Sequence, residues 1–145
     1  MNYALGYSKA EKQVLNSWAE WLDSIDWTAF CTFTTHYRLS KYSARKKMET
    51  MTHHLKIKYN DNFKIFWVAE PASYKNDYHV HALIKIDESE LQIKDSLTQA
   101  WHAVSPPSGY RQHNLLDVQK YEPSKGGRYY IAKHIQKDNI DYDIG

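Results

Sequence analysis

One segment constrains the fold more than any other: residues 78–86 alternate polar and apolar side chains and are rich in β-branched and aromatic residues. This pattern predicts a β-strand, in which His79 and His81 share one face because they are two positions apart. A second strand-like run, residues 63–70, ends in Glu70. Two imidazoles and a carboxylate on a rigid sheet can hold a divalent metal ion. The same pattern is also typical of a solvated strand face.

A second group of reactive side chains lies in residues 128–137, whose apolar positions have near-helical spacing. On a helix, Tyr130, Lys133 and His134 share one face. A tyrosine hydroxyl with its usual pKa near 10 is a poor nucleophile, but a metal ion that polarises a phosphate makes its attack feasible. A lysine beside it would offset negative charge. The pattern therefore indicates a tyrosine that forms a phosphotyrosine ester.

Tyr129 and Tyr130 compete for this role. Adjacent residues point about 100° apart on a helix, so one of the two can face the metal ion, and the spacing to Lys133 favours Tyr130. The alternatives for Tyr129 are packing with a wet hydroxyl or stacking on a base. The alternative for Lys133 is a solvated helix lysine.

Together these pieces resemble the motifs of the HUH endonuclease superfamily, and most closely those of single-tyrosine rolling-circle replication initiators, the Rep proteins. The first motif would be the strand at residues 30–35, the second His79-Val80-His81, and the third Tyr130-Ile131-Ala132-Lys133. Some Rep proteins carry a second tyrosine four residues after the first. His134 stands at that place here, so the chain resembles the single-tyrosine type.

The resemblance implies a mechanism and its partners. His79, His81 and Glu70 would hold Mg²⁺ or Mn²⁺, and Tyr130 would attack single-stranded DNA at a replication origin, in unpaired or hairpin form. The products would be a 5′-phosphotyrosine adduct and a free 3′-hydroxyl that primes synthesis, and the reverse attack would rejoin the strand. Lys133 would offset charge, and His134 would be a proton relay or a replaced tyrosine. Host replication proteins are further candidate partners.

Composition places the DNA contacts locally. The 145 residues are 42% hydrophobic and 25% charged, as in a single globular domain spanning residues 1–145, and the net charge is only +2. Any DNA-binding surface must therefore be a local one. Two segments mix basic residues with aromatics or glycines, and their candidate contacts are Arg38, Lys41, Tyr42 and Arg45, and then Lys125 and Arg128. A solvated amphipathic helix is the alternative for the first segment.

The expected fold is α+β: a mostly antiparallel sheet of ferredoxin-like or RRM-like kind with helices on one face, leaving the other face for the metal. A leading amphipathic helix at 8–24 precedes the expected strands 27–35, 63–70, 78–86 and 114–120 and helices 40–59, 87–102 and 128–137. One cysteine, Cys31, excludes an intramolecular disulfide and is read as a core residue. We expect neither a secretory signal nor a membrane span, and a location in a bacterial or archaeal cytoplasm or inside a virus-infected cell.

Two other functions fit part of the pattern. A single-tyrosine HUH transposase or a relaxase would use a related site. A non-catalytic RRM-like module for single-stranded nucleic acid would instead use aromatic side chains such as Phe33 and Trp67 as stacking platforms. No phosphate-binding Walker motif occurs in the sequence.

Overall fold

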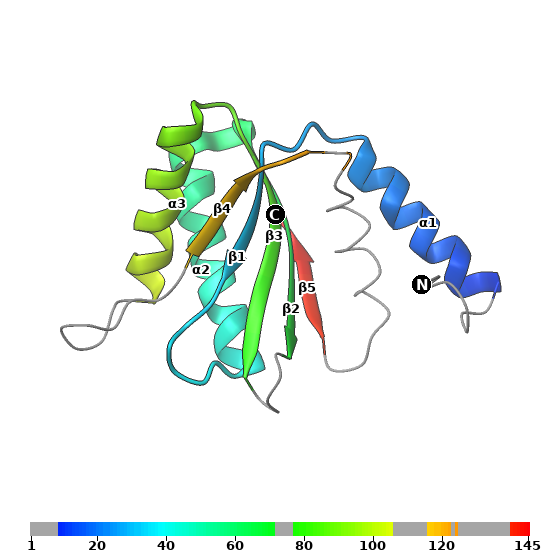
Figure 1. Ribbon diagram of the computed structural model, residues 1–145, viewed down its shortest axis with the longest axis horizontal. Coiled ribbons are helices and arrows are strands. Elements are labelled where there is room, and N and C mark those ends of the chain that lie inside the picture. The colour runs from blue at the N-terminus through cyan, green and yellow to red at the C-terminus, as the bar shows by residue number, and fades with distance from the viewer. Residues whose placement is uncertain (1–8, 72–76, 106–115, 123, 125–139) are drawn as a thin grey trace.

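The computed structural model describes residues 9–71, 77–105, 116–122, 124 and 140–145 (Figure 1). They form an antiparallel five-stranded sheet with the order β4-β1-β3-β2-β5, on which three helices pack. The elements, in chain order, are α1 (Lys9–Asp23), β1 (Ala29–Phe33), α2 (Lys41–Tyr59), the 3₁₀ turn η1 (Asn60–Asn62), β2 (Phe63–Pro71), β3 (Tyr78–Ile86), α3 (Glu90–Val104), β4 (Leu116–Lys120) and β5 (Asp141–Ile144). The expected α+β class with a mostly antiparallel sheet is confirmed.

β2 and β3 form the centre of the sheet. They pair over nine residues, from Phe63 opposite Ile86 to Pro71 opposite Tyr78. Long runs of β-branched and aromatic residues suit this place because both of their faces are covered over most of their length. The predicted strands 63–70 and 78–86 are therefore confirmed to within one residue.

Helices α2 and α3 begin at serines that cap them. Ser40 Oγ accepts a hydrogen bond from the Ser43 amide at 3.0 Å, and Ser89 Oγ accepts one from the Gln92 amide at 3.4 Å. Each cap satisfies an amide that has no carbonyl partner within its helix. At the other end of α2, Asn60 takes a positive φ of 54° and stops the helix before η1.

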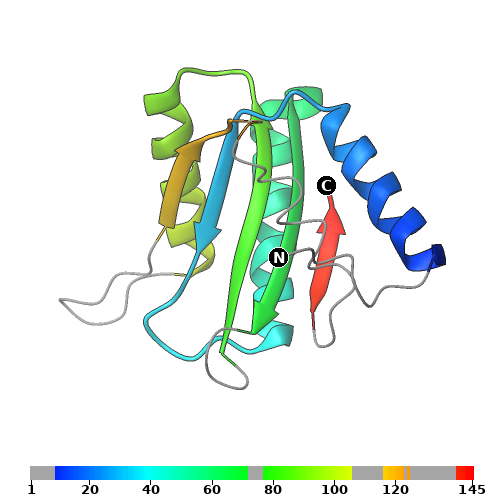
Figure 2. The ribbon, with the colours of Figure 1, turned by 45° about the vertical axis from the view of Figure 1, so that its right-hand side comes forward.

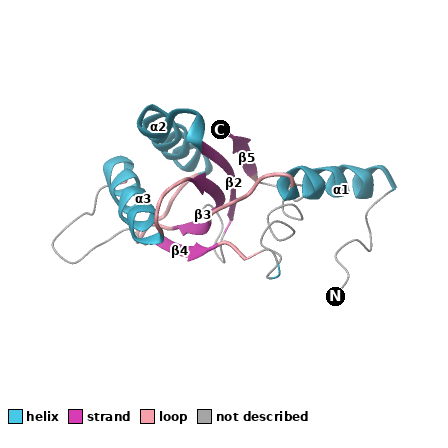
Figure 3. Cartoon of the chain, turned by 90° about the horizontal axis from the view of Figure 1, so that it is seen from above, coloured by secondary structure: helices cyan, strands magenta, loops and turns pink. Residues whose placement is uncertain are grey.

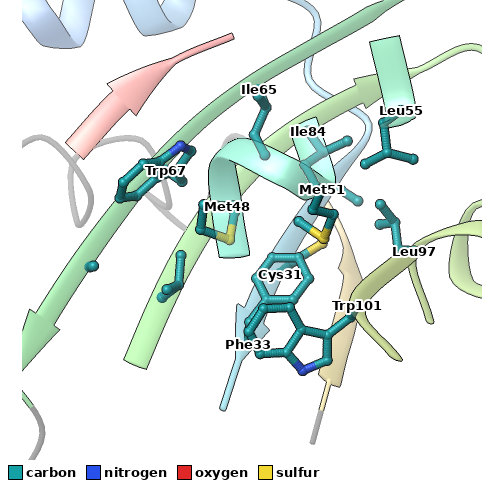
Figure 4. Packing of buried hydrophobic residues seen from close by; sticks show 14 of the residues in the cluster. Cys31, Phe33, Met48, Met51, Leu55, Ile65, Trp67, Ile84, Leu97 and Trp101 are labelled. Atoms are coloured by element: carbon teal, nitrogen blue, oxygen red, sulfur yellow. The ribbon is translucent and has the colours of Figure 1, made fainter. Parts of the chain in front are cut away.

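The main core lies between the sheet and the helices α2 and α3. Side chains from alternate strand positions face it, and Met48, Met51 and Leu55 of α2 fill its centre (Figure 4). Cys31 is fully buried in this core, as expected. Burial raises the pKa of its thiol, and the charge of Asp117 adds to this effect.

Helix α1 packs on the opposite face of the sheet. Figure 3 shows α2 and α3 on one side of the strands and α1 on the other. A smaller cluster holds α1 there, and it comprises the buried Leu22, Trp27, Phe66, Val68 and Leu83. Trp18 and Trp21 lie at its margin, with ring centroids 5.5 and 6.3 Å from that of Phe66. The aromatic stripe of the predicted leading helix packs against this cluster and is partly buried, but helices cover both faces of the sheet rather than the one face that was expected.

Two further differences concern the strands β5 and β1. β5 was not expected, and it pairs with β2 from Phe66 opposite Ile144 to Ala69 opposite Asp141. β1 is shorter than the predicted strand 27–35. The predicted helix 128–137 lies outside the described residues.

Candidate metal centre

The three predicted metal ligands come together on the sheet. Antiparallel pairing places Glu70 of β2 directly opposite His79 of β3, and His81 lies two residues further along the same face. Glu70 Oε1 is 3.3 Å from Nε2 of His79 and 3.3 Å from Nε2 of His81. One ligand atom from each residue lies within 4.8 Å of the other two. We call Glu70, His79 and His81 the triad.

This geometry fits a metal ion. Nitrogen and oxygen ligands bind Zn²⁺-sized ions at about 2.0–2.2 Å, so two ligands of one ion lie up to about 4.4 Å apart. Small side-chain rotations would bring the triad to such distances. The donor set of two imidazoles and one carboxylate is that of open sites in which further positions remain for water or substrate. The triad could therefore hold a metal ion.

The triad lies on the face of the sheet opposite α2 and α3. Its strand neighbours Tyr78, Val80 and Ala82 point to the helices and are buried in the main core. The side chains of Glu70 and His81 are 11% and 12% exposed, and that of His79 is 26% exposed. The site is thus walled by protein on one side and accessible beside His79.

β1 supplies the neighbours of His81. Thr32 pairs with His81 across the strands, and its Oγ1 lies 3.3 Å from Nδ1 of the imidazole. The Phe30 ring is parallel to that of His81, with an interplanar angle of 2° and ring centroids 6.1 Å apart. The two imidazoles of the triad meet edge to face at 4.7 Å. The ring of His81 is therefore positioned from both sides.

Arg38 lies at the same end of the sheet as the triad. It is an exposed residue in the loop between β1 and α2, and the next residue, Leu39, ties this loop to β3. The Leu39 amide donates to Asp77 Oδ1 at 3.2 Å, and the Tyr78 amide donates to the Leu39 carbonyl at 2.8 Å. These bonds hold the loop beside the residue that precedes His79.

Lys41 and Tyr42 begin α2 and are both exposed, with Tyr42 at 72%. The ammonium group of Lys46 lies 5.7 Å from the centroid of the Tyr42 ring. Such an exposed aromatic residue among lysines is suited to stacking on a base next to phosphates. Both predicted contacts therefore remain accessible.

Arg45, the fourth predicted contact in this segment, is engaged by β5. Its Nε and Nη2 donate to the two carboxylate oxygens of Asp141 at 2.6 and 2.8 Å, and Nη1 donates to Asp143 at 3.1 Å. Nη2 also donates to the Tyr142 carbonyl, and the guanidinium lies 5.1 Å from the Trp67 ring centroid. The hydrogen bonds that Arg45 donates to Asp141 and Asp143 raise the pKa of its guanidinium. This geometry gives Arg45 a structural role, and its contact with a phosphate stays a prediction.

The predicted nucleophile and its neighbours lie outside the described residues. They are Tyr130 with Lys133, the secondary candidates Tyr129 and His134, and the basic residues Lys125 and Arg128. Their roles remain predictions.

Thr32 was not singled out from the sequence as a site residue. It falls inside the first motif of the family resemblance, but its contact with His81 depends on the pairing register of β1 and β3, which the sequence pattern does not define.

No protein-family model matches the chain, and no curated protein and no solved structure shows significant similarity to it. Among the described helices, none has the length and apolarity needed to cross a lipid bilayer.

Proposed function

We propose that this protein is an HUH-type endonuclease that nicks and rejoins single-stranded DNA through a covalent phosphotyrosine intermediate and thereby initiates rolling-circle replication. The observation that carries the proposal is the triad, in which Glu70 Oε1 lies 3.3 Å from both imidazoles on the face of the sheet opposite α2 and α3. The order of the sequence motifs, from the first strand to Tyr130 and Lys133, identifies Tyr130 as the candidate nucleophile.

The strand topology supports an approach of Tyr130 to the triad. β4 and β5 lie at opposite edges of the sheet and point the same way (Figure 2). Connections between parallel strands are right-handed in about 98% of cases. The step from β4 to β5 leads across the sheet in the direction opposite to the step from β3 to β4. A right-handed connection between β4 and β5 would therefore cross the face opposite α3. That face carries the triad.

The residues on either side of the connection agree with this path. Tyr121, just after β4, and Ile140, just before β5, both pack against the cluster of Leu22, Phe66 and Leu83 on the triad face. The Tyr121 amide also donates to the Thr28 carbonyl at 3.0 Å. β5 begins at Asp141, which lies opposite Ala69, the residue before Glu70.

The chemistry assigns a task to each residue. Glu70, His79 and His81 would hold Mn²⁺ or Mg²⁺, which when bound supplies charge stabilisation to a non-bridging phosphate oxygen. The Tyr130 oxygen forms a bond to phosphorus, the bond from phosphorus to the 3′ oxygen breaks, and that oxygen gains a proton as the tyrosine loses one. Lys133 offsets the charge of the five-coordinate phosphate.

The DNA strand would approach from the loop end of the sheet. Arg38 lies there, and Lys41 and Tyr42 begin the helix that follows, so these exposed residues could bind phosphates and stacked bases of a strand that passes this end of the sheet. The substrate of this proposal is an origin sequence in single-stranded or hairpin form, inside a bacterial, archaeal or virus-infected cell, where host replication proteins extend the 3′-hydroxyl. A single-tyrosine transposase or relaxase remains the alternative within the superfamily.

The RRM-like binding module has less support. Phe33 and Trp67, the stacking residues it would use, are buried between the sheet and the helices at 0% and 2% exposure. Neither ring can stack on a base without unfolding the core.

A denaturing gel tests the proposal. The protein is incubated with a panel of single-stranded oligonucleotides, including hairpins, in Mn²⁺ or in chelator. We expect a shifted protein–DNA band with Mn²⁺ that is absent in chelator, in His79→Ala and in Tyr130→Phe. Tyr129→Phe is the matched control and should keep the band. A band that persists in Tyr130→Phe would contradict the assignment of the nucleophile, and binding without any adduct across origin-derived sequences would favour a non-catalytic module.

A further inference from the structure

We infer that Thr32 is a positioning residue that sets the tautomer and the ring orientation of His81 and thereby the metal affinity of the triad; this inference rests on the proposed metal site. Thr32 Oγ1 lies 3.3 Å from His81 Nδ1, the ring nitrogen on the side away from Glu70. Nε2 of the same ring faces Glu70 Oε1. The imidazole is therefore contacted at both nitrogens.

The sheet makes this contact rigid. Thr32 and His81 are directly opposite in the antiparallel pairing of β1 and β3, and the residues on either side of each are paired as well. Side chains at directly opposite positions have Cβ atoms about 4.5–5.5 Å apart. A β-branched threonine has few χ1 rotamers in this setting, so its hydroxyl is held toward the ring.

The chemistry of a metal ligand explains why the hydroxyl matters. To bind a metal ion through Nε2, a neutral imidazole must carry its proton on Nδ1. Thr32 Oγ1 can accept a hydrogen bond from that Nδ1–H, which favours the tautomer that leaves the Nε2 lone pair available. Removing such a partner of a metal-bound histidine typically costs about 10- to 100-fold in metal affinity.

His79 provides the contrast. Its side chain is 26% exposed against 12% for His81, and no described residue forms a hydrogen bond with its Nδ1. The two histidines of the triad therefore differ in how firmly they are held. His81 is the fixed ligand, and the parallel ring of Phe30 further limits its rotation.

The test is calorimetric titration of the full chain with Mn²⁺, without DNA. We expect Thr32→Val, which removes the hydroxyl and keeps the shape, to weaken Mn²⁺ binding about 10- to 100-fold. Thr32→Ala should show the same weakening, and Thr32→Ser, which restores a hydroxyl, should return the affinity to near the wild-type value. Circular dichroism of each variant checks that the sheet is folded.

Thr28→Val is the matched control. The Thr28 hydroxyl also bridges to β3, where it donates to the Ile86 carbonyl at 3.1 Å and accepts from the Ile86 amide at 3.2 Å, but it lies at the far end of the strands from the triad. We expect this variant to lose stability and to keep its Mn²⁺ affinity.

A second measurement reads the tautomer itself. In protein loaded with diamagnetic Zn²⁺, the His81 Nδ1–H proton should exchange slowly with water, and its NMR signal should disappear in Thr32→Val. A Thr32→Val variant with wild-type Mn²⁺ affinity overturns the role of Thr32 alone. A wild-type protein that binds no Mn²⁺ overturns the proposed function and this inference together.

Discussion

Two clusters of charged and titratable groups lie near the β2–β5 edge of the sheet, on opposite faces. On the face of α2, Arg45 binds Asp141 and Asp143 of β5. On the other face, Glu70 contacts His79 and His81. The guanidinium is permanently charged and matches the fork of a carboxylate, whereas imidazoles are charged only when protonated.

The two clusters combine carboxylates with basic side chains, but their geometry gives them different roles. The Arg45 cluster uses four donated hydrogen bonds to join two elements that are far apart in the chain, and it is complete without a ligand. The triad aims one carboxylate oxygen and two ring nitrogens at a common point. The first cluster should stabilise the fold, and the second should bind a cation.

The largest expected effect is on metal affinity, which should depend on the triad and not on the Arg45 cluster. Glu70→Gln removes the charge of the carboxylate with little change in shape. Mn²⁺ affinity should fall at least about 100-fold, because losing a ligand costs more than losing a group that only orients one. Calorimetric titration measures this. The control is Glu49→Gln, because Glu49 of α2 also pairs with Arg45, with 3.3 Å between Oε2 and Nη1. This variant should leave the affinity unchanged, and equal losses in the two variants would contradict the comparison.

The next effect is on the free energy of unfolding, to which the Arg45 cluster should contribute. Arg45→Met should lower the free energy of unfolding by about 2 kcal/mol, because it removes several hydrogen bonds to carboxylates from a side chain that is 31% exposed. Arg45→Lys should recover little of this, since an ammonium cannot make the bidentate contact.

Urea denaturation gives the values for this comparison. Lys46→Met, one residue further along α2, is the matched control and should stay within about 0.5 kcal/mol of the wild type. Equal midpoints for the Arg45 and Lys46 variants would remove the structural role of Arg45.

A smaller effect tests whether the core between the sheet and the helices α2 and α3 is closed to solvent. Burial raises the pKa of Cys31 above the ordinary value of 9.0, so the unfolded chain loses the thiol proton at a lower pH than the folded protein does. The contribution of the protonated thiol to the free energy of unfolding is fully present below pH 9.0 and is lost as the pH rises above this value. Between pH 8 and pH 10 the wild type should lose about 1 kcal/mol more stability than Cys31→Ala. Identical pH profiles would show that the thiol ionises in the folded state.

The smallest expected effect concerns an ordinary surface ion pair. Lys120 and Glu90 are 3.8 Å apart, and their side chains are 69% and 73% exposed. Glu90→Gln should change the free energy of unfolding by less than about 0.5 kcal/mol. A thermal melt measures it, and a change as large as that of Arg45→Met would mean that exposure does not distinguish the two pairs.

The triad was predictable from the sequence because it depends on local rules. Two-residue alternation places His79 and His81 on one face of a strand, and the antiparallel pairing of two strands that are consecutive in the chain brings Glu70 opposite His79. Both rules involve neighbouring segments, so no long-range information was needed.

The remaining features depend on contacts between distant segments. Asp141 and Asp143 are poor strand formers, so β5 carries no clear pattern, and it is held by an arginine that the sequence presented as a candidate DNA contact. The contact between Thr32 and His81 required the register of β1 against β3. The stripe of Trp18, Trp21 and Leu22 predicted a helix, but periodicity does not say which face of the sheet the helix covers.

The span of the Arg45 cluster also has a kinetic meaning. Arg45 and Asp141 are separated by 96 positions in the chain, so their contact closes a long loop and gains little until the central strands are already paired. A contact made after the rate-limiting step leaves the folding rate nearly unchanged and slows unfolding. The Arg45 contacts should therefore form late in folding and break early in unfolding. Arg45 should act chiefly on the lifetime of the native state.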